Sequence, residues 1–221
     1  ALSVLDSLSS SGELPGHEAK ARFALLYSMA LDKNYIDSTD DSLINVAVKW
    51  YRRHGDPDEK LKAYYYQGRI YQNAGDKESA MESFVKAEAY VEDAEDDIAA
   101  GLLYDAMSNI ALEIFDDDSV LKFCRKAEYH YRKAGDKNRY AYALLGLAIY
   151  YTTEGQYTEL SLALDTIRMF WNDLDIRTKD SYYQLRLGEF KETGQYEKLE
   201  SGLEEYIREF PEDTINWMSV S

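Results

Sequence analysis

The sequence predicts an all-α solenoid, in which about five helix pairs follow a short N-terminal helix. Two observations carry this prediction. The segment Tyr51–Asp56, which reads Tyr-Arg-x-x-Gly-Asp, returns 80 residues later as Tyr131–Asp136. A fixed period of this kind is typical of repeats that bury their apolar faces only against their neighbours. Between the glycines, apolar and small residues recur three and four positions apart, which is the spacing of one face of a helix.

Composition leaves room for this architecture. The chain has 221 residues, of which 45% are hydrophobic, with 3 prolines and 12 glycines, and no low-complexity linker divides it. No stretch of roughly 18 apolar residues predicts a membrane span. Cys124 is the single cysteine, so no internal disulfide is expected. One cysteine fits a reducing compartment without excluding an oxidising one.

Charge narrows the choice of partners. The net charge is −16, from 25 basic and 41 acidic residues. We therefore expect no nucleic-acid binding and no membrane contact by this region, since both need Lys and Arg to displace counterions. Eleven acidic residues and no Lys or Arg lie between Ala87 and Leu121. A solvated face explains this cluster, and a surface that attracts a basic partner is the alternative.

The N-terminal element is a short helix. Leu2, Leu5 and Leu8 form an apolar stripe, and the breaker run 9–12 and Pro15-Gly16 follow. We expect residues 1–16 to form a helix and loop that cover the first repeat of an array over 17–221. The units of that array are predicted near 21–60, 61–100, 101–140, 141–179 and 180–213, with the start of a sixth at 214–221.

The unit that begins at Leu61 shows the pattern most fully. Its spacing places three residues on one face of a first helix, a turn glycine with a capping aspartate after them, and three residues on one face of a second helix. These residues are Tyr64, Gly68, Tyr71, Gly75, Asp76, Ala80, Phe84 and Ala87. Small residues at Gly68 and Ala80 let the two helices approach closely, and a bulkier side chain there would overpack the contact.

This arrangement resembles the tetratricopeptide repeat (TPR), whose signature residues occupy the same places. The other units match less fully, and Phe115-Asp116 stands where Gly-Asp is expected. The resemblance implies a right-handed superhelix with a concave groove lined by the first helix of each pair. The period near 40 exceeds the usual TPR period of about 34, so we expect longer helices. In this respect the chain is similar to bacterial TPR proteins with extended repeats, although a period near 40 also suits HEAT-type arrays.

The resemblance also implies which residues face the groove. It assigns a partner-binding role to Lys62, Tyr65, Arg69, Asn73, Asp105, Asn109, Tyr142, Leu145, Ile149 and Gln184, with Gly188 leaving a dip. Arg69, with Tyr65 and Asn73, is expected to hold a peptide carboxylate or backbone. The alternative is that Arg69 only pairs with Asp105. Chaperone-tail binding is rejected, because the clamp of Lys, Asn and Arg that it needs is missing and Asp105 would repel an acidic tail.

Catalytic and metal chemistry is not predicted. The three histidines share no helical spacing, and no phosphate-binding glycine loop occurs. The acidic run Asp37–Asp41 is better explained by turn and capping duty than by calcium binding. Cys124 falls at a packing place on a second helix and is expected to be buried. We therefore expect no catalytic residue, no metal and no cofactor.

The function expected from the sequence is non-catalytic recognition of a protein or peptide segment in the concave groove. The alternative is a ligand- or peptide-sensing TPR module of a longer regulatory protein. A sixth unit would place Trp217 at a position where TPRs favour tryptophan, which fits either a short closing segment or a longer chain. By resemblance the protein is bacterial and periplasmic or membrane-anchored, while the sequence also allows the cytoplasm.

Overall fold

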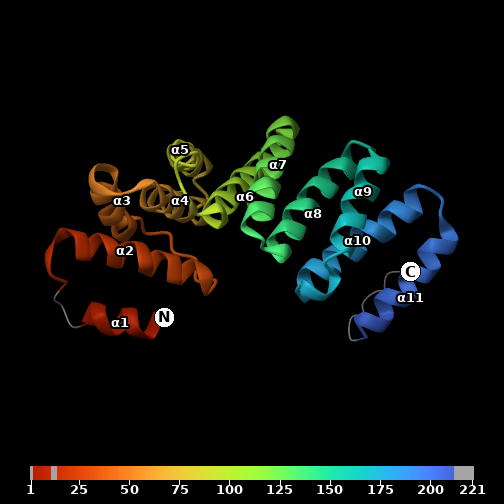
Figure 1. The fold of residues 1–221 in the computed structure, drawn as a ribbon, viewed down its shortest axis with the longest axis horizontal. Helices are drawn as coiled ribbons and strands as arrows, with labels where there is room; N and C mark the ends of the chain where they lie inside the picture. The colour runs from red at the N-terminus through yellow and green to blue at the C-terminus, as the bar shows by residue number, and fades with distance from the viewer. Residues whose placement is uncertain (1, 11–13, 212–221) are drawn as a thin grey trace. The chain divides into compact units, whose positions relative to one another are not determined.

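The computed structural model describes residues 2–10 and 14–211 (Figure 1). Over these ranges the chain is all-helical, with eleven α-helices, one 3-10 turn and no strand. The predicted all-α class is therefore confirmed. Contacts divide the chain into two compact units, Ala1–Ala134 and Gly135–Ser221. The predicted start of a sixth repeat, 214–221, lies outside the described residues.

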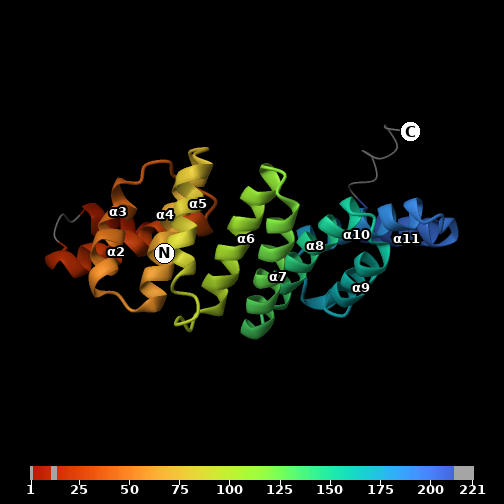
Figure 2. The same cartoon turned by 90° about the horizontal axis from the view of Figure 1, so that it is seen from above.

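The first unit contains an N-terminal helix and three helix hairpins (Figure 2). Its helices are α1 (Leu2–Ser10), α2 (Gly16–Lys33), α3 (Ser42–His54), α4 (Pro57–Asn73), α5 (Lys77–Glu88), α6 (Asp97–Glu113) and α7 (Asp117–Ala134). The short helix α1 lies against α2, where the Tyr27 hydroxyl donates to the Asp6 carboxylate over 2.8 Å. This contact anchors α1 to the first hairpin.

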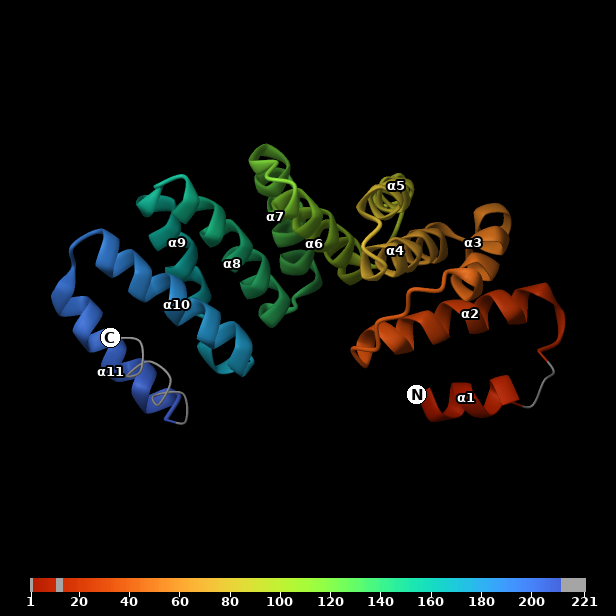
Figure 3. The same ribbon diagram turned by 180° about the vertical axis from the view of Figure 1, so that it is seen from behind.

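The second unit contains two hairpins. Its helices are α8 (Lys137–Thr153), α9 (Tyr157–Arg168), α10 (Ile176–Glu192) and α11 (Tyr196–Glu209), with the 3-10 turn η1 (Trp171–Asp173) between α9 and α10. Figure 3 shows α10 between α9 and α11. The first helices α4, α6, α8 and α10 each have 17 residues. The period near 40 therefore does not come from helix length alone, because the connections 89–96 and 169–175 also contribute residues to it.

One turn geometry closes the first helix of every described hairpin. At Gly75 the backbone is left-handed (φ 78°), and the following Asp76 N–H donates to the Tyr71 carbonyl over 2.9 Å. The Asp76 carboxylate then accepts from the Ser79 N–H over 3.0 Å and caps α5. These bonds satisfy backbone groups that a helix end leaves without partners. The predicted turn at Gly75 and cap at Asp76 are confirmed.

Close helix contacts explain the small residues. A methyl group at Gly68 would come within 2.3 Å of the Phe84 ring, and one at Gly101 within 2.3 Å of the Tyr131 ring. Both rings are fully buried. Only glycine therefore lets these large aromatic side chains pack directly on the backbone of the neighbouring helix.

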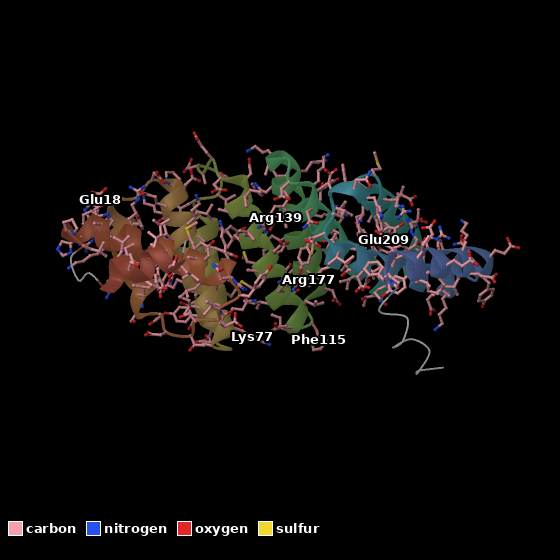
Figure 4. All side chains as sticks on the ribbon, turned by 90° about the horizontal axis from the view of Figure 1, so that it is seen from below. Glu18, Lys77, Phe115, Arg139, Arg177 and Glu209 are labelled. Atoms are coloured by element: carbon pink, nitrogen blue, oxygen red, sulfur yellow. The ribbon has the colours of Figure 1, made fainter. Side chains whose placement is uncertain are left out.

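Ion pairs link successive hairpins within each unit. In the first unit Lys62 pairs with Asp96 (2.6 Å) and Lys77 with Glu113 (2.7 Å). Lys126 and Glu88 lie 2.6 Å apart in the same way. Figure 4 shows Lys77 at the edge of this unit. Several acids of the cationless stretch 87–121 are thus paired with basic residues of neighbouring helices, which reduces the charge that they offer to a basic partner.

Candidate functional site

The predicted groove residues of α4 are mostly engaged within the first unit. Arg69 donates through Nε to Asp32 on α2 over 3.1 Å and through Nη1 to Gln72 over 2.6 Å. Arg69 is thus paired within the first unit, and the partner that the structure shows is Asp32 on the preceding first helix α2. The Asn73 amide donates to the Ser38 carbonyl over 3.3 Å.

Tyr65 and Leu145 are not groove residues. Each is only 3% exposed. The Tyr65 ring packs edge-on against Tyr66, with centroids 4.8 Å apart, and lies 6.0 Å from the Phe84 ring. Burial is also the main cause that raises the pKa of the Tyr65 hydroxyl. The prediction that these two side chains line an accessible groove is wrong, because α4 and α8 are covered on more than one side by neighbouring helices.

The other predicted groove residues of the first unit are polar. Asp105 accepts a hydrogen bond from the Tyr131 hydroxyl over 2.6 Å, and Asn109 is exposed. The depression beside Arg69 and Asn73 is about the size of one water molecule. These residues offer polar groups to a partner.

The predicted residues of the second unit remain accessible. On α8, Tyr142 is 53% and Ile149 is 45% exposed. On the contacting helix α10, Gln184 is exposed, and a methyl group at Gly188 would meet no atom within 4 Å. We call Tyr142, Ile149, Gln184 and Gly188 the α8–α10 surface. It combines exposed apolar groups with open space.

A second hollow was not predicted from the sequence. It has a volume of about 400 Å³, and its lining residues come from α9, α10 and α11. We call it the α9–α11 cleft. Arg186 of α10 lies in its lining and is 8% exposed. Nη1 of Arg186 donates to Glu189 over 2.8 Å and to Ser161 over 3.2 Å, while Nη2 contacts Asp165.

One feature of the sequence indicates this cleft, namely the charged residue at position 186 of the repeat pattern. Arg186 stands 39 residues after Leu147, which itself stands 40 residues after Met107. Leu147 and Met107 are buried apolar residues. A charged residue is unusual at a register that is buried and apolar in α6 and α8, and this departure points to a local polar network in α10. Across the described residues every buried polar side-chain atom has a hydrogen-bond partner.

The described residues include one thiol, and it is not accessible. Cys124 is buried, as predicted, and burial raises the pKa of its thiol to about 11. No cluster of three or more His, Cys, Asp or Glu side chains among the described residues is arranged to hold a metal ion. None of the helices described has the length and apolar character needed to cross a membrane.

Comparison with known proteins identifies a structural neighbour. The fold is similar to that of BtubC (BKLC) from P. vanneervenii, with a TM-score of 0.72 and 12% sequence identity. The match covers 94% of this chain and 86% of BtubC. No model of a known protein family matches the sequence, and no curated protein does. At this identity the likeness shows a shared helical fold and nothing about a shared activity.

Proposed function

We propose that this protein is a right-handed superhelical TPR array that binds a protein or peptide segment without catalysing a reaction. The observation that carries the proposal is the exposure of Tyr142 and Ile149 on the α8–α10 surface, where both side chains are about half exposed at positions that the TPR resemblance assigns to the groove. The repeated hairpins with one turn geometry support the TPR assignment. The likeness to BtubC supports the fold alone.

The spacing on α8 suits recognition of an extended or helical segment. Tyr142 and Ile149 are seven residues apart, so they lie on the same side of the helix, two turns from each other. Tyrosine contributes apolar area and a polar tip, and it is enriched at protein interfaces. Gly188 on α10 leaves room for a partner side chain. A partner that covers this surface would remove both apolar side chains from water.

The experiment begins with a partner that co-purifies from cells of the source organism and is then produced separately. Its dissociation constant is measured by calorimetry against the wild type and against the double variant Tyr142→Ser/Ile149→Ser. Both side chains are already half exposed, so folding is expected to survive. We expect affinity to fall at least about tenfold, equivalent to about 1.4 kcal/mol.

The matched control is Val85→Ser/Leu162→Ser. These residues are apolar and 52% and 63% exposed, but they lie on the second helices α5 and α9. The control should leave affinity unchanged. If the control weakens binding and the α8 double variant does not, the partner uses the second helices and the proposal is wrong.

A further inference from the structure

The ion pair of Arg186 and Glu189 stands at registers that hold a buried apolar pair in α6. At the corresponding registers α6 carries Met107 and Ile110, which are both 2% exposed. A buried ion pair is generally no more stabilising than well-packed apolar residues of similar size. The packing of the repeats therefore does not require these charges in α10.

The cleft next to this pair has the size of a small-molecule site. Its roughly 400 Å³ falls within the range of about 300–1,000 Å³ found for such sites. Gly202 on α11 also lines the cleft, and a methyl group there would come within 2.9 Å of the Leu187 side chain. Apolar groups of Leu187 and Phe190 line the cleft together with polar groups of Gln195, Lys198 and Ser201.

The two carboxylates that contact Arg186 differ in their surroundings. The Glu189 side chain is only 4% exposed, whereas the Asp165 side chain is 69% exposed. Glu189 compensates the buried guanidinium charge from within. Asp165 contacts Nη2 from the solvent side, so water can solvate its carboxylate if it moves away, and the cost of that exchange is low.

Further cations lie around the same space. Arg168 and Lys198 line the cleft, and Arg168 also pairs with Glu205 of α11 over 3.3 Å. With Asp165 displaced, the lining carries three cations, namely Arg168, Arg186 and Lys198, against two carboxylates, Glu189 and Glu205. The displaced state therefore favours a single negative charge.

We propose that the α9–α11 cleft binds a ligand that carries a carboxylate and an apolar group, with Arg186 as the receiving residue and Asp165 as the internal carboxylate that the ligand displaces. The apolar group would contact Leu187 and Phe190. The ligand is a small carboxylic acid or the glutamate side chain of a partner. This inference does not depend on the α8–α10 surface, because Arg186 lies two residues from both Gln184 and Gly188, on the other side of α10.

The test uses 3-phenylpropanoate as probe and the neutral 3-phenylpropanamide as its isosteric control. Each is titrated into the whole protein while the Arg186 Nε–Hε signal is followed by NMR. We expect saturable shifts with the acid and none with the amide. The double variant Arg186→Met/Glu189→Ile, which introduces the apolar pair that α6 carries at the same registers, should weaken binding of the acid at least tenfold without lowering the melting temperature, because no unpaired buried charge is left.

The variant Asp165→Ala tests the displacement directly. It is expected to fold, because an exposed helical position tolerates alanine. Removal of the internal competitor should tighten binding of the acid severalfold. Equal binding of acid and amide would overturn the proposal, and so would unchanged or weaker binding to Asp165→Ala. The Tyr142→Ser/Ile149→Ser variant should bind the acid as the wild type does, which separates this site from the proposed partner surface.

A second arm distinguishes the two sources of the carboxylate. The peptide acetyl-Phe-Glu-Phe-amide is compared with its Gln counterpart and with the free acid. Tighter binding of the Glu peptide assigns the cleft to a partner's side chain, and tighter binding of the free acid assigns it to a small molecule. Failure of all three to bind would overturn the proposal.

Discussion

Phe115 occupies the turn position that Gly75 occupies one repeat earlier, and both residues are left-handed, with φ of 59° and 78°. The Asp116 N–H donates to the Ala111 carbonyl over 2.9 Å, just as the Asp76 N–H donates to the Tyr71 carbonyl. The hydrogen bonds of the turn thus impose the conformation, whichever residue is present. Phe115 is also 88% exposed, so its ring gains little from packing.

Phe115→Gly is therefore expected to stabilise the protein. The left-handed conformation costs a residue with a side chain roughly 1–2 kcal/mol, and the greater freedom of glycine in the unfolded chain offsets part of this gain. We expect a net increase of up to about 1 kcal/mol in the free energy of unfolding, measured by urea denaturation. Gly75→Ala should shift it in the opposite direction. A loss of stability in Phe115→Gly would show that the ring is held by contacts that compensate the backbone.

Gly68→Ala and Gly188→Ala are expected to have opposite effects. A methyl group at position 68 would lie 2.3 Å from the Phe84 ring, which is fully buried, so overpacking should cost about 1–3 kcal/mol or more. At position 188 the methyl group meets no atom within 4 Å, and alanine should gain roughly 0.5–1 kcal/mol through helix propensity. Thermal unfolding of both variants tests the close contact. Equal changes in melting temperature for the two variants would contradict the close contact between Gly68 and Phe84.

Stability should fall at high pH because of Tyr71. Its hydroxyl donates to the Asp41 carboxylate over 2.7 Å. This hydrogen bond, followed by burial, raises the pKa of Tyr71 from 10.0 to about 12. A raised pKa favours the protonated hydroxyl in the folded state, so its contribution is fully present below about pH 10 and is lost as the pH rises towards about 12. The difference in unfolding free energy between wild type and Tyr71→Phe should shrink over this range. If the difference stayed constant with pH, the raised pKa of Tyr71 would not contribute to the pH dependence of stability.

The Cys124 thiol should react slowly in the folded protein. Burial raises its pKa to about 11, so little thiolate is present at pH 8, and the side chain is only 5% exposed. We expect labelling by a disulfide reagent at pH 8 to be at least about a hundredfold slower than in urea, since it must wait for an opening of the structure. Comparable rates in both conditions would place the thiol at the surface.

The repeat pattern predicted the hairpins well because its signals are local. Gly75 and Asp76 define a turn and a cap through their own backbone and side chain, and Gly68 reports a contact with Phe84 only 16 residues away. Whether a side chain is exposed depends on helices that are more distant in the sequence. Tyr65 was assigned to the groove from its place in the repeat, but neighbouring helices bury it.

The α9–α11 cleft was missed for a related reason. A charged residue at position 186 breaks the apolar register, yet the sequence alone does not show whether such a residue turns outward or is buried with partners. Asp165, Ser161 and Glu189 complete the network from two helices. Their convergence depends on how α9 packs against α10, which the spacing of residues did not define.

The most direct test of partner binding is photo-crosslinking from α8. A photoreactive phenylalanine analogue is introduced at Tyr142 in one variant and at Leu162 on α9 in a control variant, which is 63% exposed in the wild type. Each is irradiated in cells of the source organism. We predict that one protein is crosslinked from position 142 in high yield, that it is not crosslinked from 162, and that the purified partner binds the wild type directly. No specific crosslink from 142, or the same proteins captured from both positions, would contradict recognition through this surface.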